Sequence, residues 1–356
     1  MKRSISIINT EIQLINVIEA LQHFECNDNC LVIGQFNLKP ERIKKIEKML
    51  EEPLFRQHFN KIVHLPLYLS GKNPLRFIGY ILAYIKFFFF VLFSKKFDCC
   101  FFGVMTDIMV KPIAYLAYYR NPDCMLCVID EGVRVMEDAR IRVQNVSQVP
   151  QKQRKRNLFC GYFLAITRKW SYPAVTYFTI YQLPLLPQDS LVNNDYHFFK
   201  THKFQISPLS DNAVVIVGQP LVELEITTAE TYHSIISRIV SAYSDHTIYY
   251  APHPIENSLD QLSLYNIQIL KTQYPLELVL MTNNIFAIIG FSSTALLNSA
   301  YLKLCQNIFS IDLNDEDYFR LLDKEKMKEL NQQMMQHGIR ILQSENLNEP
   351  IQPNVL

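Results

Sequence analysis

The sequence predicts an α/β protein with two Rossmann-like halves, and three observations support this prediction. Short apolar segments of strand length alternate with helical patterns through the first half of the chain. A second series of the same kind begins near residue 213, after a stretch that is rich in prolines. The chain of 356 residues is too long for one small core and has the length of two ordinary domains.

The first half opens with a strand at 5–8 and a helix at 11–24 whose apolar residues fall on one helical face. The alternation then repeats, with strands at 30–33, 61–65, 99–104 and 125–129 and helices at 40–49, 77–93 and 110–119. Such alternation is typical of a parallel sheet that helices cover on both faces. Ligands of these sheets bind beyond the carboxyl ends of the strands, so polar residues at strand ends are the functional candidates.

The segment from Tyr172 to Pro208 contains four prolines and several polar clusters, a composition that suits an interdomain connection. We therefore expect the domains to span residues 1–206 and 207–356. The second half has predicted strands at 213–217, 247–250, 267–270, 287–289 and 307–310 and helices at 228–242, 275–281, 295–304 and 316–336. The two Rossmann-like halves are expected to face one another across a cleft.

Composition excludes several classes of protein. Hydrophobic residues make up 49% of the chain and charged residues 19%, which is typical of a globular protein with a large core rather than a disordered chain. The formal net charge of +1 gives no general signal for nucleic acid or another polyanion. No nucleic-acid partner is therefore predicted.

The eight cysteines lie in apolar, strand-like surroundings, which favours buried thiols in a reducing compartment over disulfides. Cys124 and Cys127 have the CxxC spacing, but the second pair that a zinc site needs is absent. The basic start of the chain is followed only by an apolar stretch of strand length without a cleavage site. We expect no metal site and a cytoplasmic protein.

Two segments leave alternatives open about a membrane. The apolar segment Phe77–Phe93 is interrupted by Lys86 and is shorter than the roughly 20 residues that a spanning helix needs. It is either a buried core helix or a helix that lies at the membrane face with its lysines reaching toward water. The basic run at 152–156 is either a solvated loop or a contact for membrane phosphates or an acidic glycan.

Three polar clusters follow predicted strands. The first is Asp130-Glu131-Gly132, where neighbouring carboxylates on extended backbone point to opposite sides, so that only one can face a cleft. Gly132 allows a sharp turn after the pair. By itself this triplet is also what a polar turn at the end of a strand looks like.

The second cluster is Pro252-His253-Pro254, at the end of the predicted strand 247–250. The flanking prolines restrict the backbone, so His253 can protonate or hydrogen-bond a phosphate at a small cost in ordering. The third cluster, Ser292-Ser293-Thr294, precedes a predicted helix, where hydroxyls and unpaired amides form a ready anion site. The alternatives are a structural histidine and a simple helix cap.

Together, these residues resemble the bacterial sialyltransferases of the lipooligosaccharide and polysialic-acid capsule families. Those families share an acidic-acidic-glycine motif, a His-Pro motif and a later pair of hydroxyl residues, in the order in which this chain has them. The segment 250–254 looks especially like the lipooligosaccharide enzymes. Ile255-Glu256 departs from the basic residue that often follows their His-Pro.

The resemblance implies a GT-B fold and an inverting transfer of sialic acid from CMP-sialic acid onto a cell-surface glycan, either lipooligosaccharide or capsule. The first domain would serve the acceptor and the second would bind the CMP-sugar. Glu131, or else Asp130, would take the proton from the acceptor hydroxyl. His253 would stabilise or protonate the leaving CMP phosphate.

The resemblance also implies the nucleotide contacts. The hydroxyl cluster Ser292, Ser293 and Thr294 would hold the phosphate through hydroxyl and amide donors, with Pro254 at the nucleotide beside the histidine. Gly218 would let the nucleotide approach the backbone, and Glu277 would bind the ribose hydroxyls. No cofactor and no essential metal is implied, since CMP leaves with its own phosphate.

Two alternatives stay open. The same clusters would serve another CMP-activated ulosonic acid, such as Kdo, legionaminate or pseudaminate. The apolar helix and the basic run would also suit a non-catalytic, membrane-peripheral component of a capsule assembly complex. Such a scaffold, however, has no reason to keep a carboxylate, a proline-bracketed histidine and a hydroxyl cluster at strand ends.

Overall fold

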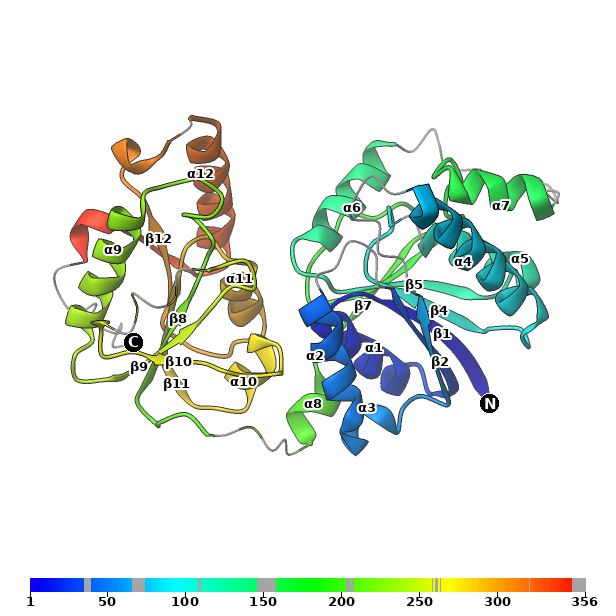
Figure 1. The fold of residues 1–356 in the computed structure, drawn as a ribbon, viewed down its shortest axis with the longest axis horizontal. Coiled ribbons are helices and arrows are strands. Elements are labelled where there is room, and N and C mark those ends of the chain that lie inside the picture. The colour runs from blue at the N-terminus through cyan, green and yellow to red at the C-terminus, as the bar shows by residue number, and fades with distance from the viewer. Residues whose placement is uncertain are drawn as a thin grey trace. The chain divides into compact units, whose positions relative to one another are not determined.

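Two parallel β-sheets organise the computed structural model, one in each of two compact units, Met1–His202 and Lys203–Leu356 (Figure 1). The first unit ends four residues before the boundary expected from the prolines. The structure describes residues 1–34, 40–65, 74–107, 110–145, 158–202, 206, 208–257, 259, 262, 264–319 and 321–347. The basic run at 152–156 lies outside the described residues.

The first unit contains a seven-stranded sheet of order β3-β2-β1-β4-β5-β6-β7, in which every neighbouring pair is parallel. Its strands are β1 (Lys2–Ile8), β2 (Cys26–Gly34), β3 (Lys61–Leu65), β4 (Cys99–Phe102), β5 (Met125–Ile129), β6 (Thr176–Thr179) and β7 (Ser190–Asn193). The order reverses between β1 and β4, which is the switch point of a doubly wound Rossmann fold. The carboxyl ends of β1, β4 and β5 meet there.

Helices cover both faces of this sheet (Figure 1). The helices are α1 (Glu11–His23), α2 (Pro40–Glu51), α3 (Pro53–Arg56), α4 (Pro74–Phe93), α5 (Val110–Arg120), α6 (Arg134–Gln144), α7 (Leu158–Ile166) and α8 (His197–Thr201). Helix α1 begins where the Thr10 hydroxyl accepts the Gln13 amide at 3.4 Å, which satisfies one of its unpaired N–H groups. The predicted parallel sheet with helices on both faces is confirmed.

The second unit contains a six-stranded parallel sheet of order β10-β9-β8-β11-β12-β13. Its strands are β8 (Ala213–Val217), β9 (Thr247–Ala251), β10 (Gln268–Ile269), β11 (Ile285–Gly290), β12 (Ile308–Asp312) and β13 (Arg340–Gln343). Its helices are α9 (Ala229–Ala242), α10 (Leu276–Met281), α11 (Thr294–Tyr301) and α12 (Leu321–Gln336), with 3-10 turns η3 (Asp315–Asp317) and η4 (Ser344–Asn346).

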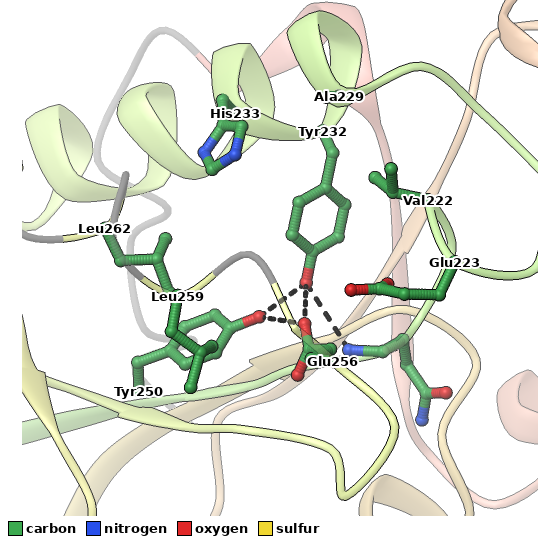
Figure 2. A pocket seen from close by; sticks show the side chains of 10 residues that line it. Val222, Glu223, Ala229, Tyr232, His233, Tyr250, Glu256, Leu259 and Leu262 are labelled. Atoms are coloured by element: carbon green, nitrogen blue, oxygen red, sulfur yellow. Dashed lines mark hydrogen bonds between the residues drawn. The ribbon is translucent and has the colours of Figure 1, made fainter.

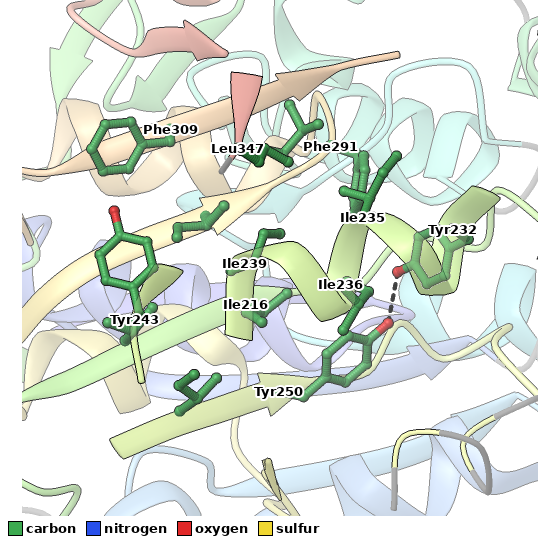
Figure 3. Close-up of a cluster of buried hydrophobic side chains, with 14 of the residues drawn as sticks. Ile216, Tyr232, Ile235, Ile236, Ile239, Tyr243, Tyr250, Phe291, Phe309 and Leu347 are labelled. Carbon is green, nitrogen blue, oxygen red and sulfur yellow. Dashed lines mark hydrogen bonds between the residues drawn. The ribbon is translucent and has the colours of Figure 1, made fainter. Parts of the chain in front are cut away.

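The core of the second unit lies between α9 and its sheet (Figure 3). Ile235, Ile236 and Ile239 of α9 are buried against the strand residues Ile216 and Tyr250. Burying each such side chain contributes about 1.5–3 kcal/mol, so this cluster supplies the unit with a core of its own. The second predicted Rossmann-like half is also confirmed.

The interpretation of residues 172–208 as a connection was wrong. This stretch contains β6, β7 and α8, all of which belong to the first unit. The two strands have only four residues each, and none of the four prolines lies inside them: Pro173 precedes β6, Pro184 and Pro187 lie between the strands, and Pro208 follows both. The prolines therefore indicated loops next to β6 and β7, and the prediction missed these two short strands.

The apolar segment predicted as a helix forms most of α4, and it is buried on one side only. Tyr84, Phe87, Phe88 and Val91 are buried, whereas the opposite side of the helix is exposed. Within the described ranges, no helix is both long and apolar enough to cross a membrane. Six of the eight cysteines, all of which the structure describes, are buried free thiols; Cys160 is exposed.

Candidate active site

The acidic pair follows β5 directly, at the carboxyl end of the strand. Asp130 and Glu131 contact different neighbours, as alternation along extended backbone requires. Gly132 has a φ of 63°, a left-handed conformation that glycine adopts without the steric penalty of a side chain. The chain therefore turns after the pair, and α6 begins at Arg134.

Asp130 holds the sheet together. Its side chain is 3% exposed, Oδ1 accepts the Thr179 hydroxyl, and Oδ2 accepts the Ile180 amide at 3.0 Å. Burial raises the pKa of Asp130 to about 7, although hydrogen bonds from Thr179, Ile180 and Asn194 act in the opposite direction. Both oxygens are therefore engaged in joining the end of β5 to the end of β6.

Glu131 is in a different situation. Its Oε2 atom is buried and has no hydrogen-bond partner within the described part of the chain. Burial raises the pKa of Glu131 to about 7; a hydrogen bond from Gln13 and the charge of Arg134 lower it, and the charge of Asp107 raises it. A carboxyl group that titrates near neutral pH can accept a proton from a bound hydroxyl.

Gln13 is a neighbour of Glu131 that the sequence analysis missed. It is 2% exposed on α1, and its Oε1 accepts the Asn9 amide at 2.7 Å. That bond fixes the side-chain amide, which donates a hydrogen bond to Glu131. A buried polar residue on the apolar face of the predicted helix 11–24 was the available signal.

In the second unit, three adjacent parallel strands bring the remaining candidates to one edge of the sheet. Val217, the last residue of β8, pairs with Ala251 of β9 on one side and with Gly290 of β11 on the other. The residues that follow these strand ends are Gly218, Pro252-His253-Pro254 and Phe291-Ser292-Ser293. The register of the sheet therefore gathers the glycine, the His-Pro motif and the hydroxyl cluster.

The His-Pro motif forms a tight turn. The Glu256 amide donates to the His253 carbonyl at 3.0 Å, with Pro254 at the second position, which favours the fixed φ of proline. The Ile255 amide donates to His253 Nδ1 at 3.3 Å. In the neutral imidazole the proton is then on Nε2, which can donate it to a phosphate oxygen.

Glu256 anchors this turn, and it too was missed as a functional residue. Its Oε2 accepts the His253 amide at 2.5 Å, and its Oε1 accepts the hydroxyls of Tyr250 at 2.5 Å and Tyr232 at 3.2 Å. Burial raises the pKa of the Glu256 carboxyl, while these donors lower it. The residue that departs from the family pattern thus has a structural explanation in this chain.

The same network explains Gly218. A Cβ atom at this position would lie 2.6 Å from the Tyr250 hydroxyl and would also collide with the Glu256 carboxylate. The small cavity beside these groups measures about 20 Å³, and Figure 2 shows Tyr232, Tyr250 and Glu256 converging in it. A cavity of this size holds about one water molecule and no nucleotide. It is therefore part of the packing that supports the His-Pro turn and is not a nucleotide site.

Ser292 does not present its hydroxyl outward. Its Oγ donates to Asn331 Oδ1 at 2.7 Å, and Asn331 Oδ1 also accepts the Ser310 hydroxyl at 2.9 Å. The Ser292 amide donates to Ser310 Oγ at 2.9 Å, and its φ of 42° is left-handed. Ser292 therefore shapes the chain before α11, with its hydroxyl proton committed to α12.

Ser293 and Thr294 form the start of α11. The buried Ser293 caps the helix, because its Oγ accepts the Ala295 amide at 3.2 Å. The amides of Ser293 and Thr294 have no hydrogen-bond acceptor within the described ranges, and they lie at the positive end of the helix dipole. Glu277 of α10 is held nearby, since its Oε1 accepts Asn298 Nδ2 of α11 at 2.8 Å.

Within the described residues, no group of three histidine, cysteine, aspartate or glutamate side chains could hold a metal ion. The polar groups that the structure places at the two sites are carboxylates, an imidazole, hydroxyls and amides. The first unit offers a buried carboxyl with a raised pKa, and the second offers donors suited to a phosphate.

Residues 176–311 match the family model described as alpha-2,8-polysialyltransferase (POLYST). The matched segment includes His253, Pro254 and the hydroxyl cluster at 292–294, but it begins after the acidic pair and spans less than half of the chain. The match confirms the resemblance to polysialyltransferase-type enzymes that the motifs suggested. No curated protein matches the sequence.

Solved structures similar to this chain include two sialyltransferases. The GT-B domain of a Photobacterium damselae sialyltransferase has a TM-score of 0.50 at 12% identity and covers 96% of this chain and 100% of that chain. A Photobacterium 2,6-sialyltransferase in complex with CMP and lactose has a TM-score of 0.54 at 11% identity, covering 95% and 78%.

A third similar structure, UDP-GlcNAc 2-epimerase from Neisseria meningitidis bound to UDP-GlcNAc, has a TM-score of 0.56 at 14% identity and covers 97% and 89%. At such identities these likenesses show the fold alone. They confirm the predicted GT-B fold of two Rossmann-like units.

Proposed function

We propose that this chain is a glycosyltransferase that moves sialic acid from CMP-sialic acid to a lipooligosaccharide or capsular glycan, with inversion. The proposal starts from the polysialyltransferase match over residues 176–311. The observation that carries the proposal is the buried Glu131 Oε2 atom, which has no hydrogen-bond partner among the described residues, on a carboxyl whose pKa is about 7. A general base for a sugar hydroxyl needs both features.

In the proposed reaction, an acceptor hydroxyl oxygen attacks the anomeric carbon of the donor sugar. Glu131 takes the proton of that hydroxyl, and the bond between the anomeric carbon and the CMP phosphate oxygen breaks. The electron pair leaves with the phosphate, so negative charge grows there. His253 donates from Nε2 to the departing phosphate, either as a hydrogen bond or as a proton.

Glu131 is preferred over Asp130 as the base. The oxygens of Asp130 are occupied by Thr179 and Ile180, so a substrate hydroxyl would have to displace a buried hydrogen bond. Glu131 needs no such displacement, since its buried oxygen gains a partner when a hydroxyl binds. Asp130 then supports the site by fixing the backbone that carries Glu131.

On the donor side, the amides of Ser293 and Thr294 and the imidazole of His253 supply the phosphate contacts of the proposal. Ser292 contributes backbone shape rather than a hydroxyl donor, because Asn331 already accepts its proton. Pro254 holds the turn against the nucleotide, and Gly218, which leaves room for the Tyr250 hydroxyl and the Glu256 carboxylate, acts through the support of that turn. The Glu277 carboxylate, positioned by Asn298, would accept ribose hydroxyls.

The donor sugar is tested directly by ligand-induced stabilisation. CMP-sialic acid and CMP-Kdo, together with the legionaminate and pseudaminate analogues, would be compared for their shift in melting temperature and for CMP release with mixed acceptors. We expect CMP-sialic acid to stabilise the protein and to release CMP when a glycan acceptor is present. Stabilisation without any CMP release would favour a non-catalytic component of an assembly complex.

We also propose that the protein works at the cytoplasmic side of the inner membrane as a peripheral protein. Support comes from the exposed side of α4, which a buried core helix does not require.

A further inference from the structure

The first unit carries an exposed apolar surface that its own core does not use. Six large side chains form it: Leu82, Ile85, Phe89 and Phe93 of α4 and Phe159 and Phe163 of α7. Their exposed fractions run from 46% for Ile85 to 78% for Phe93. We call these six residues the α4–α7 face.

The face is periodic on both helices. On α4 its residues recur at three- and four-residue spacing, which places them on one side of the helix, opposite the buried residues Phe87 and Val91. On α7, Phe159 and Phe163 are four residues apart, and the opposite side buries Gly161 against Tyr115. Among the described side chains, each helix therefore has a buried inward face and a second apolar face that points outward.

Contacts between aromatic rings make the two helices one surface. The Phe88 ring lies 6.0 Å from Phe159 of α7 and 5.4 Å from Phe89, whose ring stacks 5.9 Å from Phe93. The Tyr162 hydroxyl of α7 donates to the Tyr84 carbonyl of α4 at 3.1 Å. In Figure 1, α4, α5 and α7 gather on the same side of the first sheet.

Positive charge surrounds this face. Lys86 is exposed on the same side of α4, Lys95 and Lys96 are exposed just after it, and Lys169 is exposed just after α7. The sequence has no aspartate or glutamate between Glu52 and Asp98. It also has none between residues 138 and 189, a stretch in which the sequence carries the basic run at 152–156.

We propose that the α4–α7 face docks onto the surface of an anionic bilayer. The phenylalanines would enter the boundary between headgroups and acyl chains, and the lysines would remain among the lipid phosphates. A second copy of the chain fits less well, because a symmetric contact through this face would bring its lysines against one another. An apolar protein groove would not account for the long stretches without a carboxylate.

Vesicle co-sedimentation of the full chain tests the proposal. Phosphatidylcholine vesicles with about a third phosphatidylglycerol would be compared with pure phosphatidylcholine at low salt, and again near 1 M salt, where the Debye length is about 3 Å. We expect binding to the anionic vesicles and at least about tenfold weaker partitioning to the neutral ones and at high salt. Protein that stays in the supernatant with anionic vesicles would overturn the proposal.

Variants locate the contact. The double substitution Phe159→Ser, Phe163→Ser should lower partitioning by about tenfold or more, and Lys95→Ser, Lys96→Ser should lower it and weaken its salt dependence. Phe319→Ser, at a phenylalanine of the second unit that is 57% exposed, is the matched control and should bind as the parent does. Equal binding by all variants would place the contact elsewhere and refute the α4–α7 face.

Two further measurements separate the other outcomes. Circular dichroism and melting temperature of each variant exclude unfolding as the cause of lost binding; if Phe159→Ser, Phe163→Ser unfolds, Phe93→Ser provides the same test from α4. Sedimentation velocity without lipid reports self-association. A dimer that the Phe159→Ser, Phe163→Ser variant converts to a monomer, without vesicle binding by the parent, would assign the face to a second copy and contradict the proposal.

Discussion

Glu256 and His253 are joined by two reciprocal hydrogen bonds. The Glu256 carboxylate accepts the His253 amide at 2.5 Å, and the Glu256 amide donates to the His253 carbonyl at 3.0 Å. The backbone of the histidine is thereby fixed at both of its polar groups. Because Tyr232 and Tyr250 hold the same carboxylate, the core of the second unit determines where the imidazole stands.

Glu256→Ala should reduce both stability and transfer. It leaves the His253 amide without its side-chain acceptor and removes the acceptor that the Tyr232 and Tyr250 hydroxyls share, although these two hydroxyls lie 2.7 Å apart and one can donate to the other. Each buried donor left unsatisfied costs about 1–3 kcal/mol. Glu256→Gln keeps one acceptor for the His253 amide, and the tyrosine hydroxyls can rotate to accept from its NH2 group. We expect a loss of transfer of about tenfold or more for Ala and substantial rescue by Gln, measured as kcat, KM and melting temperature.

The control for the two Glu256 variants is Glu223→Gln. Glu223 lines the same small cavity, but its carboxylate accepts the Asn257 amide instead of the His253 amide.

His253→Ala should lower transfer and CMP affinity together, because the contact between His253 and the phosphate exists in both the ground and transition states. If Glu256→Ala is stable and fully active while His253→Ala is inactive, Glu256 does not position His253, but the role of His253 at the leaving phosphate is upheld.

Glu131→Gln should abolish most transfer without affecting nucleotide binding. The substitution keeps the size of the side chain and removes the base, so kcat should fall by about 100-fold or more while the Kd for CMP changes little. In the parent enzyme kcat/KM should rise with pH up to about 7 and then level off, as Glu131 loses its proton. This rise should disappear in Glu131→Gln.

Asp130→Asn should behave differently, through stability. Its new NH2 group must face either the Thr179 hydroxyl or the Ile180 amide, both of which donate to Asp130 in the parent. We expect a loss of about 1–3 kcal/mol in the free energy of unfolding, measured by denaturant titration. Inactivity of a stable Asp130→Asn variant beside a nearly normal Glu131→Gln would reverse the assignment within the pair.

The buried carboxyl of Glu131 should also make the folded state less stable as pH rises. Its pKa is about 7 in the folded protein against 4.5 in the unfolded chain, so the folded form holds more protons between these values. The unfolding free energy therefore falls across this window because of Glu131. Glu131→Gln should melt about 2–5 °C higher than the parent at pH 8 and no higher at pH 4; an unchanged difference at the two pH values would contradict this.

Ser293→Ala separates helix capping from phosphate binding when it is paired with a second cap. Ser293 caps α11 and Thr228 caps α9, where its hydroxyl accepts the Thr231 amide at 3.0 Å. Either alanine substitution should cost about 1 kcal/mol of stability. We expect only Ser293→Ala to weaken CMP binding in calorimetry, because loss of this cap loosens the start of α11, where the amides of Ser293 and Thr294 lie. Equal CMP affinities for the two variants would show that the Ser293 cap does not position these amides for the nucleotide.

The predicted fold came from local patterns that the tertiary structure does not change. Alternating apolar segments and capped helices determine parallel α/β units, since each sheet face must be covered, and the strand ends then point to Asp130, Gly218, His253 and Ser292. The same local view failed at residues 172–208. Strands as short as β6 and β7 are stabilised by their neighbours in the sheet rather than by their own sequence.

Only the tertiary structure distinguished the members of each candidate cluster. Asp130 and Glu131 are equivalent in sequence, but contacts with β6 occupy the carboxylate of Asp130. Burial near α1 leaves an oxygen of Glu131 without a hydrogen-bond partner in the part of the chain that the structure describes. Ser292 looks like a phosphate donor until Asn331, 39 residues away, accepts its proton. Hydrogen bonds of this kind join segments distant in the chain, and burial raises a pKa only once those segments pack together, so neither is encoded in a local pattern.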